Sequence, residues 1–246
     1  MKKQEIAITV KDLHVYYRDM NRFSLKKGGL KAKGSGKIFK AVKGVSFEIP
    51  KGQILGICGK NGSGKSTLLR AISGIFSPDS GSINLHGNSI SLLSIGVGFQ
   101  KQLTGYENIY LSGMLLGYSK EEIDKRVDEI IEFSELGDFI YKPVRSYSSG
   151  MYSKLAFSIT AILETDIILI DEVLSVGDIH FKEKSYNKMK ELISDSNRTV
   201  VIVSHSSKTI EELCDKVIWL HEGLIKKEGK PKEIMAEYEE FMRQEN

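Results

Sequence analysis

The sequence has little cysteine and no hydrophobic run long enough to cross a membrane. Its 246 residues include two cysteines, Cys58 and Cys214, which form neither a disulfide framework nor a zinc-binding CxxC pair, so we expect reduced, buried thiols. The opening residues 1–6 lack the apolar core of a signal peptide, and no apolar run reaches the roughly 18 residues of a membrane span. These absences predict a cytosolic protein that reaches a membrane only through a partner or a surface patch.

Charge is distributed unevenly along the chain. Apolar residues make up 41% of the sequence, enough for one large core. The net charge is +3, yet residues 18–43 hold nine basic residues against one acidic residue, so this segment carries +8 and the remainder −5. The basic residues are Arg18, Arg22, Lys26, Lys27, Lys31, Lys33, Lys37, Lys40 and Lys43. Such a patch indicates an anionic neighbour (phospholipid headgroups, a phosphorylated substrate or nucleic acid) or, because it also contains four glycines, a solvated loop.

Short apolar runs predict the strands of a sheet. Residues 6–17 and 45–49 are expected to be two strands, and the basic segment between them an insertion that is part loop and part short helix. Further strands, several of the compact kind found buried in parallel sheets, are expected over residues 53–58, 82–85, 89–94, 165–170, 199–203, 217–220 and 224–227. The last two of these strands are expected to form a hairpin.

The helical period is strongest in the middle of the chain. Residues 106–161 are predicted to be helical, and residues 121–135 place apolar side chains on or near one face. A last helix is expected over residues 231–244, where it begins at a proline. We therefore predict an α/β fold with a mostly parallel sheet and a helical insert over about residues 100–160, all within one domain, residues 1–246.

A glycine-rich motif follows the strand predicted over residues 53–58. Residues 59–66 match G-x-x-x-x-G-K-[ST] at every fixed position, and a helix is predicted over residues 66–74. The glycines let backbone N–H groups point at phosphate oxygens, and the helix N-terminus adds the positive end of its dipole. Lys65 would reach the β- and γ-phosphates of ATP, and the Ser66 hydroxyl would ligate Mg²⁺. The predicted nucleotide-binding residues here are Gly59, Lys60, Asn61, Gly62, Ser63, Gly64, Lys65, Ser66 and Thr67.

Two carboxylates follow the strand predicted over residues 165–170. They are delivered to its C-terminal end, where the ligands of α/β sheets bind. Asp171 would hold Mg²⁺ through water, and Glu172 would polarise the water that attacks the γ-phosphate.

A third motif, Tyr-Ser-Ser-Gly-Met at residues 147–151, stands between the other two. It resembles the signature motif of the ATP-binding-cassette (ABC) family, L-S-G-G-Q, although Tyr replaces Leu, Ser149 replaces the first glycine and Met replaces Gln. The small residues Ser148, Ser149 and Gly150 let backbone amides approach a phosphate at the start of a helix. In that family the motif contacts the γ-phosphate bound by the opposite subunit, so the resemblance implies a homodimer that encloses two ATP molecules.

The resemblance covers most of the chain and implies roles for further residues. Tyr17 would stack on adenine, and Gln100 (with Gln102 as the alternative) would sense Mg²⁺ and contact a membrane subunit. Asp178 would meet its counterpart across the dimer, and His205 would contact the γ-phosphate. The implied fold is a P-loop NTPase core with an N-terminal antiparallel β portion and a helical subdomain.

One branch of the family is most similar. The signature variant, Leu-Ser-Val-Gly-Asp at residues 174–178 and the motif at residues 96–109 resemble the ATPases that export lipid-linked polymers, teichoic acid first and O-antigen polysaccharide second. In that branch the insertion between the first strands forms a gate element beside the membrane channel. Some O-antigen exporters add a C-terminal carbohydrate-binding domain, which we do not expect here because 246 residues leave little room for one. The resemblance implies two copies of a polytopic membrane permease and a location at the cytoplasmic face of the cell membrane.

Three alternatives remain. The chain could serve another transporter, for drug or lipid efflux or for import. A soluble ABC ATPase acting on nucleic acid or ribosomes is disfavoured, because such proteins commonly carry two cassettes or long coiled-coil inserts; nucleic acid is therefore not the expected partner. A single-site P-loop kinase would be distinguished by turnover that does not depend on dimerisation.

Overall fold

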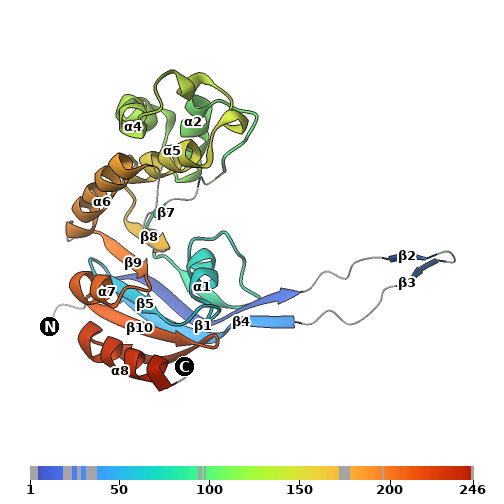
Figure 1. Cartoon of the computed structure of the whole chain (residues 1–246), viewed down its shortest axis with the longest axis vertical. Coiled ribbons are helices and arrows are strands. Elements are labelled where there is room, and N and C mark those ends of the chain that lie inside the picture. The colour runs from blue at the N-terminus through green and yellow to red at the C-terminus, as the bar shows by residue number, and fades with distance from the viewer. Residues whose placement is uncertain are drawn as a thin grey trace.

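The computed structural model describes most of the chain. The described residues are 5–18, 24–26, 29–31, 38–93, 96, 98–171, 178–195 and 197–244. They form a mixed sheet, an antiparallel sheet, a short hairpin and two groups of helices (Figure 1).

The mixed sheet joins strands that are far apart in sequence. Its order is β11-β10-β5-β9-β8-β7, and neighbouring strands are parallel except β10 and β11, which form an antiparallel hairpin. The bounds are β5 (Ile54–Cys58), β7 (Ile90–Leu93), β8 (Ile167–Asp171), β9 (Thr199–Val203), β10 (Lys216–His221) and β11 (Leu224–Gly229). The central strands are buried along nearly their whole length because both faces of the sheet are covered. The predicted parallel sheet is confirmed.

The antiparallel sheet covers one face of the mixed sheet. Its order is β4-β1-β6, and its bounds are β1 (Ile6–Arg18), β4 (Ile38–Pro50) and β6 (Ser80–Asn84). Apolar side chains of both sheets and of helix α1 (Lys65–Ile72) form one core between them. The predicted N-terminal antiparallel portion is confirmed.

The basic insertion was only partly predicted correctly. β4 begins at Ile38, not at residue 45, because Tyr17 pairs with Phe39 and Arg18 with Ile38, so the ribbon of β1 and β4 runs beyond the apolar core. The expected helix is wrong for the described residues of the insertion, which form the antiparallel strands β2 (Ser24–Lys26) and β3 (Gly29–Lys31). Figure 1 shows β2 and β3 beyond the ends of β1 and β4.

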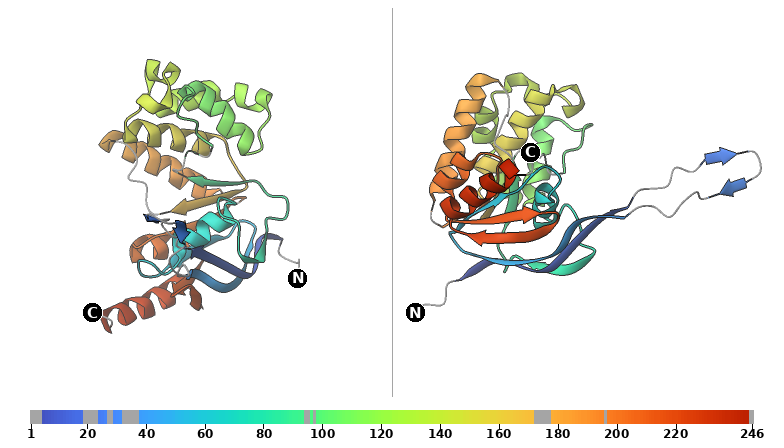
Figure 2. Two further views of the ribbon diagram at one scale, coloured as in Figure 1. Left: turned by 90° about the vertical axis from the view of Figure 1, so that its right-hand side faces the viewer. Right: turned by 60° about the horizontal axis from the view of Figure 1, so that its bottom comes forward.

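Three helices cover the opposite face of the mixed sheet (Figure 2): α6 (Ile179–Ser194), α7 (Ser207–Leu213) and α8 (Pro231–Gln244). α8 packs against Trp219 of β10, whose ring centroid lies 5.4 Å from that of Tyr238 and 5.2 Å from that of Phe241. Lys226 Nζ lies 4.3 Å from the centroid of the Trp219 ring. The predicted helix over residues 231–244 is confirmed.

The predicted helical insert forms a portion of its own. It consists of α2 (Gly105–Leu115), α3 (Lys120–Asp124), α4 (Val127–Ser134), the 3₁₀ turns η1 (Gly137–Tyr141) and η2 (Val144–Ser146), and α5 (Ser149–Ile162). The helical period of residues 121–135 is divided between two helices, because the chain turns at Arg126 between α3 and α4. Ile123, Val127 and Ile130 still share one core beneath α5, since the turn keeps all three side chains buried.

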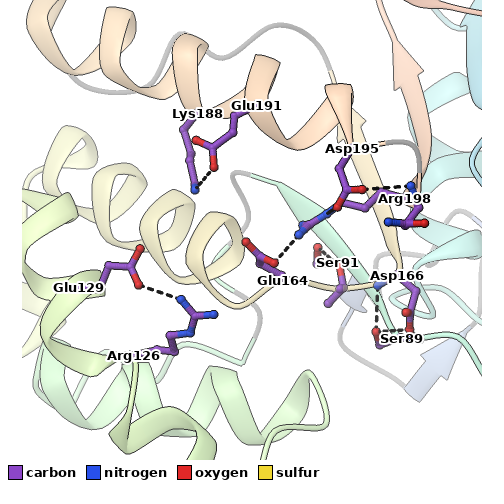
Figure 3. A network of polar contacts seen from close by, with 12 residues as sticks. Ser89, Ser91, Arg126, Glu129, Glu164, Asp166, Lys188, Glu191, Asp195 and Arg198 are labelled. Carbon is purple, nitrogen blue, oxygen red and sulfur yellow. Dashed lines mark hydrogen bonds and ion pairs between the residues drawn. The ribbon is translucent and has the colours of Figure 1, made fainter.

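Polar contacts fix the amino ends of β7 and β8 (Figure 3). The glycine-rich motif follows β5 and so lies at the other end of these parallel strands. Asp166 Oδ2 accepts hydrogen bonds from Ser89 N at 2.8 Å and from Ser89 Oγ at 2.7 Å. Arg198 donates from Nε to Asp195 Oδ2 at 2.9 Å and also pairs with Glu164, just after α5. These contacts hold the return from the helical portion onto the sheet.

Candidate nucleotide-binding site

The glycine-rich motif forms a tight loop between β5 and α1. Leu68 N donates to Gly64 O at 2.9 Å, and Ser63 N donates to Lys60 O at 3.1 Å. Gly64 precedes the helix with φ 103°, a left-handed conformation, and a Cβ there would lie 2.3 Å from Ala41 O. The loop therefore needs glycine for conformation and for space, and its shape suits a phosphate at the N-terminus of α1.

Lys65 turns back over this loop. Its side chain is buried, and Nζ donates to Gly59 O at 2.7 Å and to Lys60 O at 3.0 Å. The ammonium group is thereby held at the loop, close to the backbone that would surround a phosphate.

Ser66 and Asp171 meet although 105 residues separate them in sequence. Ser66 Oγ donates to Asp171 Oδ1 at 3.1 Å, at the point where β8 ends. A hydroxyl and a carboxylate are the hard oxygen donors that Mg²⁺ prefers, so these two residues fit the predicted metal site. Glu172, the predicted base, lies outside the described residues.

A cavity of about 210 Å³ opens beside the loop. It is lined by Phe39, Ala41, Asn61, Gly62, Gly64, Lys65, Ser66, Thr67, Val203 and His205. His205 thus reaches the cavity from the loop after β9, and its contact with a γ-phosphate stays a prediction. A second cavity of about 350 Å³ borders Phe39, Lys60 and Asn61 and adds Lys40 and Lys43 from β4.

Tyr17 does not line the cavity but contacts Thr67 and Phe39, which do. Its hydroxyl is 3.0 Å from Thr67 Oγ1, and its ring stacks on Phe39 with centroids 6.5 Å apart at 29°. Phe39 lines both cavities and is 58% exposed, so it presents a free aromatic surface there. Phe39 could not be found from a pattern in the sequence, because residues 38–40 are all exposed and show no alternation of buried and exposed positions.

Gln100 is held by its backbone. Gln100 N donates to Asn108 Oδ1 at 2.7 Å, and Asn108 Nδ2 donates to Gln100 O at 3.0 Å. The side chains of Gln100 and Gln102 are both exposed, and neither lines the cavity beside the loop. The role of Gln100, and the choice between the two, stay predictions.

The signature-like residues stand at the exposed start of α5. Ser148 caps the helix, accepting at Oγ from Met151 N at 3.2 Å, and both Ser148 and Ser149 are exposed. Tyr147 anchors the turn, donating its hydroxyl to Phe139 O at 2.8 Å, and burial raises the pKa of Tyr147 to about 12. Figure 1 shows α5 in the helical portion, apart from α1, and none of residues 148–150 lines the cavity. The structure does not bring residues 148–150 to the glycine-rich loop of the same chain, residues 59–66, which we call the phosphate loop.

Asp178 caps α6. Its Oδ1 accepts from Phe181 N at 3.0 Å, and its Oδ2 lies 2.8 Å from Lys154 Nζ on α5. The bond from Lys154 and the backbone bond from Phe181 lower the pKa of Asp178 to about 2. Its carboxylate is therefore charged at neutral pH.

The two cysteines lie in the interior of the protein. Cys58 and Cys214 are buried free thiols, and burial raises the pKa of each to about 12, so both are neutral. Within the described ranges, no helix has the length and hydropathy to cross a bilayer.

Known proteins are similar to this chain in sequence and in fold. A model of the ABC transporter family matches residues 42–175. The O-antigen export system ATP-binding protein RfbB of Myxococcus xanthus is 48% identical over 200 residues, which are 81% of this chain and 46% of that protein. The teichoic acids export ATP-binding protein TagH of Bacillus anthracis is 45% identical over 206 residues, 84% of this chain and 37% of that protein. The chain thus spans less than half the length of both relatives.

Among solved structures, the fold is similar to the dimeric ATP-binding cassette MJ0796 in a post-hydrolysis state bound to ADP and Pi. The TM-score is 0.68 over 91% of this chain and 98% of that chain, at 23% identity. This likeness shows the P-loop fold with its helical portion.

Proposed function

Because this chain belongs to the ABC transporter family, we propose that it is the ATP-binding and ATP-hydrolysing subunit of an exporter. The observation that carries the proposal is the meeting of Ser66 and Asp171 beside the phosphate loop and Lys65. The proposed cargo is a lipid-linked cell-envelope polymer, teichoic acid first and an O-antigen-type polysaccharide second. Relatives with those two roles, at 45–48% identity, support this class of cargo.

ATP would be held mainly through its phosphates. The backbone N–H groups of the loop and the N-terminus of α1 attract negative charge, and Lys65 adds a point charge. Thr67 would follow Ser66 in contacting the phosphates, while Tyr17 and Phe39 would form an aromatic wall for adenine. Ser66 and Asp171, with Gln100, would hold Mg²⁺, which neutralises charge on the β- and γ-phosphates when bound.

Hydrolysis would need a base and a group that contacts the γ-phosphate. Glu172 would take a proton from a water molecule while the oxygen of that water bonds to the γ-phosphorus. The bond between the γ-phosphorus and the β-γ bridging oxygen breaks in the same step. His205 lines the cavity and would contact the γ-phosphate.

The complete site would need two copies of the chain. Ser148, Ser149 and Gly150 begin a helix whose first residues are exposed and whose dipole favours a phosphate. In a homodimer they would contact the ATP bound by the other copy, and Asp178 would meet its counterpart nearby. We further propose two copies of a polytopic membrane permease as partners, which would place the single ATPase domain (residues 1–246) at the cytoplasmic face of the cell membrane.

The test compares two substitutions at the site. Lys65→Ala should weaken ATP binding by about tenfold or more, because a hydrogen bond to a charged group contributes about 1.5–3 kcal/mol. Glu172→Gln should bind ATP, lose about 100-fold or more of turnover, and accumulate as a dimer in ATP. Steady-state hydrolysis and size-exclusion chromatography with ATP measure both. Lys51→Ala, which removes an exposed ion pair of 2.7 Å with Glu5, is the control.

The cargo requires a second measurement. The chain is reconstituted with its membrane subunit in vesicles, and movement of lipid-linked teichoic acid or O-antigen polymer is followed with and without ATP. A parent protein that does not hydrolyse ATP would refute the ATPase assignment. A Glu172→Gln variant with the same turnover as an active parent would refute only the role of Glu172 as the base. Hydrolysis without movement of either polymer would refute only the cargo.

A further inference from the structure

One lysine joins two segments that the proposed dimer would use. Lys154 lies on α5, and its side chain is 13% exposed. Its Nζ lies 2.8 Å from Asp178 Oδ2 and 3.3 Å from Glu135 Oε2, and 4.9 Å from the centroid of the Phe181 ring. A single ammonium group therefore contacts the start of α6 and the end of α4.

Both acidic partners of Lys154 are fixed by other contacts. Asp178 uses its second oxygen to cap α6 through Phe181 N, at 3.0 Å. Glu135 ends α4 in a left-handed conformation with φ 57°, and its Oε1 accepts from Lys184 at 3.0 Å. Because each carboxylate is held at its second oxygen, Lys154 meets a preformed pair of acceptors rather than two mobile side chains.

The position of Lys154 gives this contact its importance. Lys154 lies six residues after Ser148, about 9 Å along the helix at 1.5 Å per residue. Asp178 follows the proposed base, Glu172, by six residues. The ion pair thus links the helix that begins with the signature-like residues to the residue that ends the segment after the base.

We propose that Lys154 is a positioning residue that holds the start of α5 and Asp178 in one arrangement, so that the signature-like residues face the nucleotide of the second copy while Asp178 faces its counterpart. This role rests on the proposed dimeric ATPase. Lys154 touches no part of the cavity beside the phosphate loop, so its loss should act on turnover rather than on ATP binding to that loop.

Lys184 provides a matched control on α6. Like Lys154, it contacts Glu135, and its Nζ lies over an aromatic ring, 4.5 Å from the centroid of Phe133. It also donates to Phe133 O at 3.1 Å. Its contacts join α6 to α4 and do not include Asp178. Loss of Lys184 should cost stability without disturbing the link between α5 and Asp178.

The experiment measures kcat, KM for ATP and the urea midpoint of the full chain. Lys154→Met should lower kcat by about tenfold or more while KM stays within about threefold, because the displaced groups serve the reaction and not initial binding. Lys154→Arg should restore most of the turnover, since arginine also pairs with carboxylates. Lys184→Met should lower the urea midpoint and leave kcat within about twofold of the parent. If Lys154→Met does not fold, Lys154→Gln, which keeps a polar side chain, gives the same comparison.

The outcomes separate the two proposals. A parent that hydrolyses ATP together with a Lys154→Met variant of equal kcat overturns the positioning role alone. The same holds if Lys154→Arg is as slow as Lys154→Met, or if Lys184→Met slows turnover equally. A parent that does not hydrolyse ATP overturns the proposed function, and the positioning role falls with it.

Discussion

Two glycines of the phosphate loop should respond very differently to the same substitution. Gly62 and Gly64 are both left-handed, with φ 80° and 103°. A Cβ on Gly62 would meet nothing within 4 Å. A Cβ on Gly64 would lie 2.3 Å from Ala41 O and 3.4 Å from Leu220 Cδ2.

The difference can be expressed as free energy of unfolding. Alanine in a left-handed conformation costs roughly 1–2 kcal/mol, which applies to both positions. At Gly64 the new methyl group must also displace the buried backbone of β4, and overpacking of this kind typically costs about 1–3 kcal/mol. We therefore expect Gly62→Ala to lose about 1–2 kcal/mol and Gly64→Ala about 2–5 kcal/mol.

Urea unfolding of the two variants and the parent measures this difference. Gly74→Ala is the control outside the loop, because Gly74 has φ 77° and its Cβ would also meet nothing within 4 Å. Gly62→Ala and Gly74→Ala should unfold at similar urea concentrations, and Gly64→Ala well below both. Equal midpoints for Gly62→Ala and Gly64→Ala would show that β4 yields without cost, and the steric account of this loop would be wrong.

Three further predictions concern the site and the insertion. In mixed dimers, Ser148→Arg on one copy and Lys65→Ala on the other should leave one intact site, whereas both changes on one copy opposite a parent copy should leave none; equal ATPase rates would refute composite sites. Phe39→Ala should weaken binding of a fluorescent ATP analogue by about 1–3 kcal/mol if the base stacks there, and Tyr17→Phe, which keeps the ring, by less. Unchanged affinity for Phe39→Ala would exclude it from the adenine wall. Replacing Lys26, Lys27, Lys31 and Lys33 with Gln should preserve ATPase of the isolated subunit and impair transport by the assembled exporter, because each basic residue near anionic lipid contributes about 1 kcal/mol. Intact transport at low salt would indicate a solvated loop.

The sequence was sufficient where local pattern and fold agree. The predicted strands 165–170 and 199–203 contain the apolar runs 167–170 and 200–203, and these runs form the paired interior strands β8 and β9 of the mixed sheet. The break between α3 and α4 could not be predicted, because Ile123, Val127 and Ile130 keep helical spacing across it. α6 was not predicted as a helix, although its buried residues, from Phe181 to Ile193, follow helical spacing and could have indicated it. The start of β4 was missed because pairing with β1, not burial, extends that strand.

The residues of the site also fall into two groups, those that a sequence motif indicates and those that only the folded structure reveals. Lys65, Ser66 and Asp171 belong to motifs whose residue types are fixed by phosphate and Mg²⁺ chemistry, so the sequence could single them out, and the structure brings Ser66 and Asp171 into contact. Phe39 has no such motif, and it joins the cavity only because the β1–β4 ribbon passes over the loop. Lys154 was also missed, since its contacts with Glu135 and Asp178 are tertiary and have no sequence signature.

The packing of α8 on Trp219 gives the protein a built-in optical probe. Trp219 is the one tryptophan in the sequence, and it lies between β10 and the aromatic residues of α8. Its fluorescence is therefore expected to report whether α8 is docked on the sheet, because its ring partners Tyr238 and Phe241 both belong to α8. Circular dichroism, by contrast, sums every helix in the molecule. Coincident urea transitions by the two methods would mean that the helical portion and the sheet unfold together, and separated transitions would reveal two cooperative units within the chain.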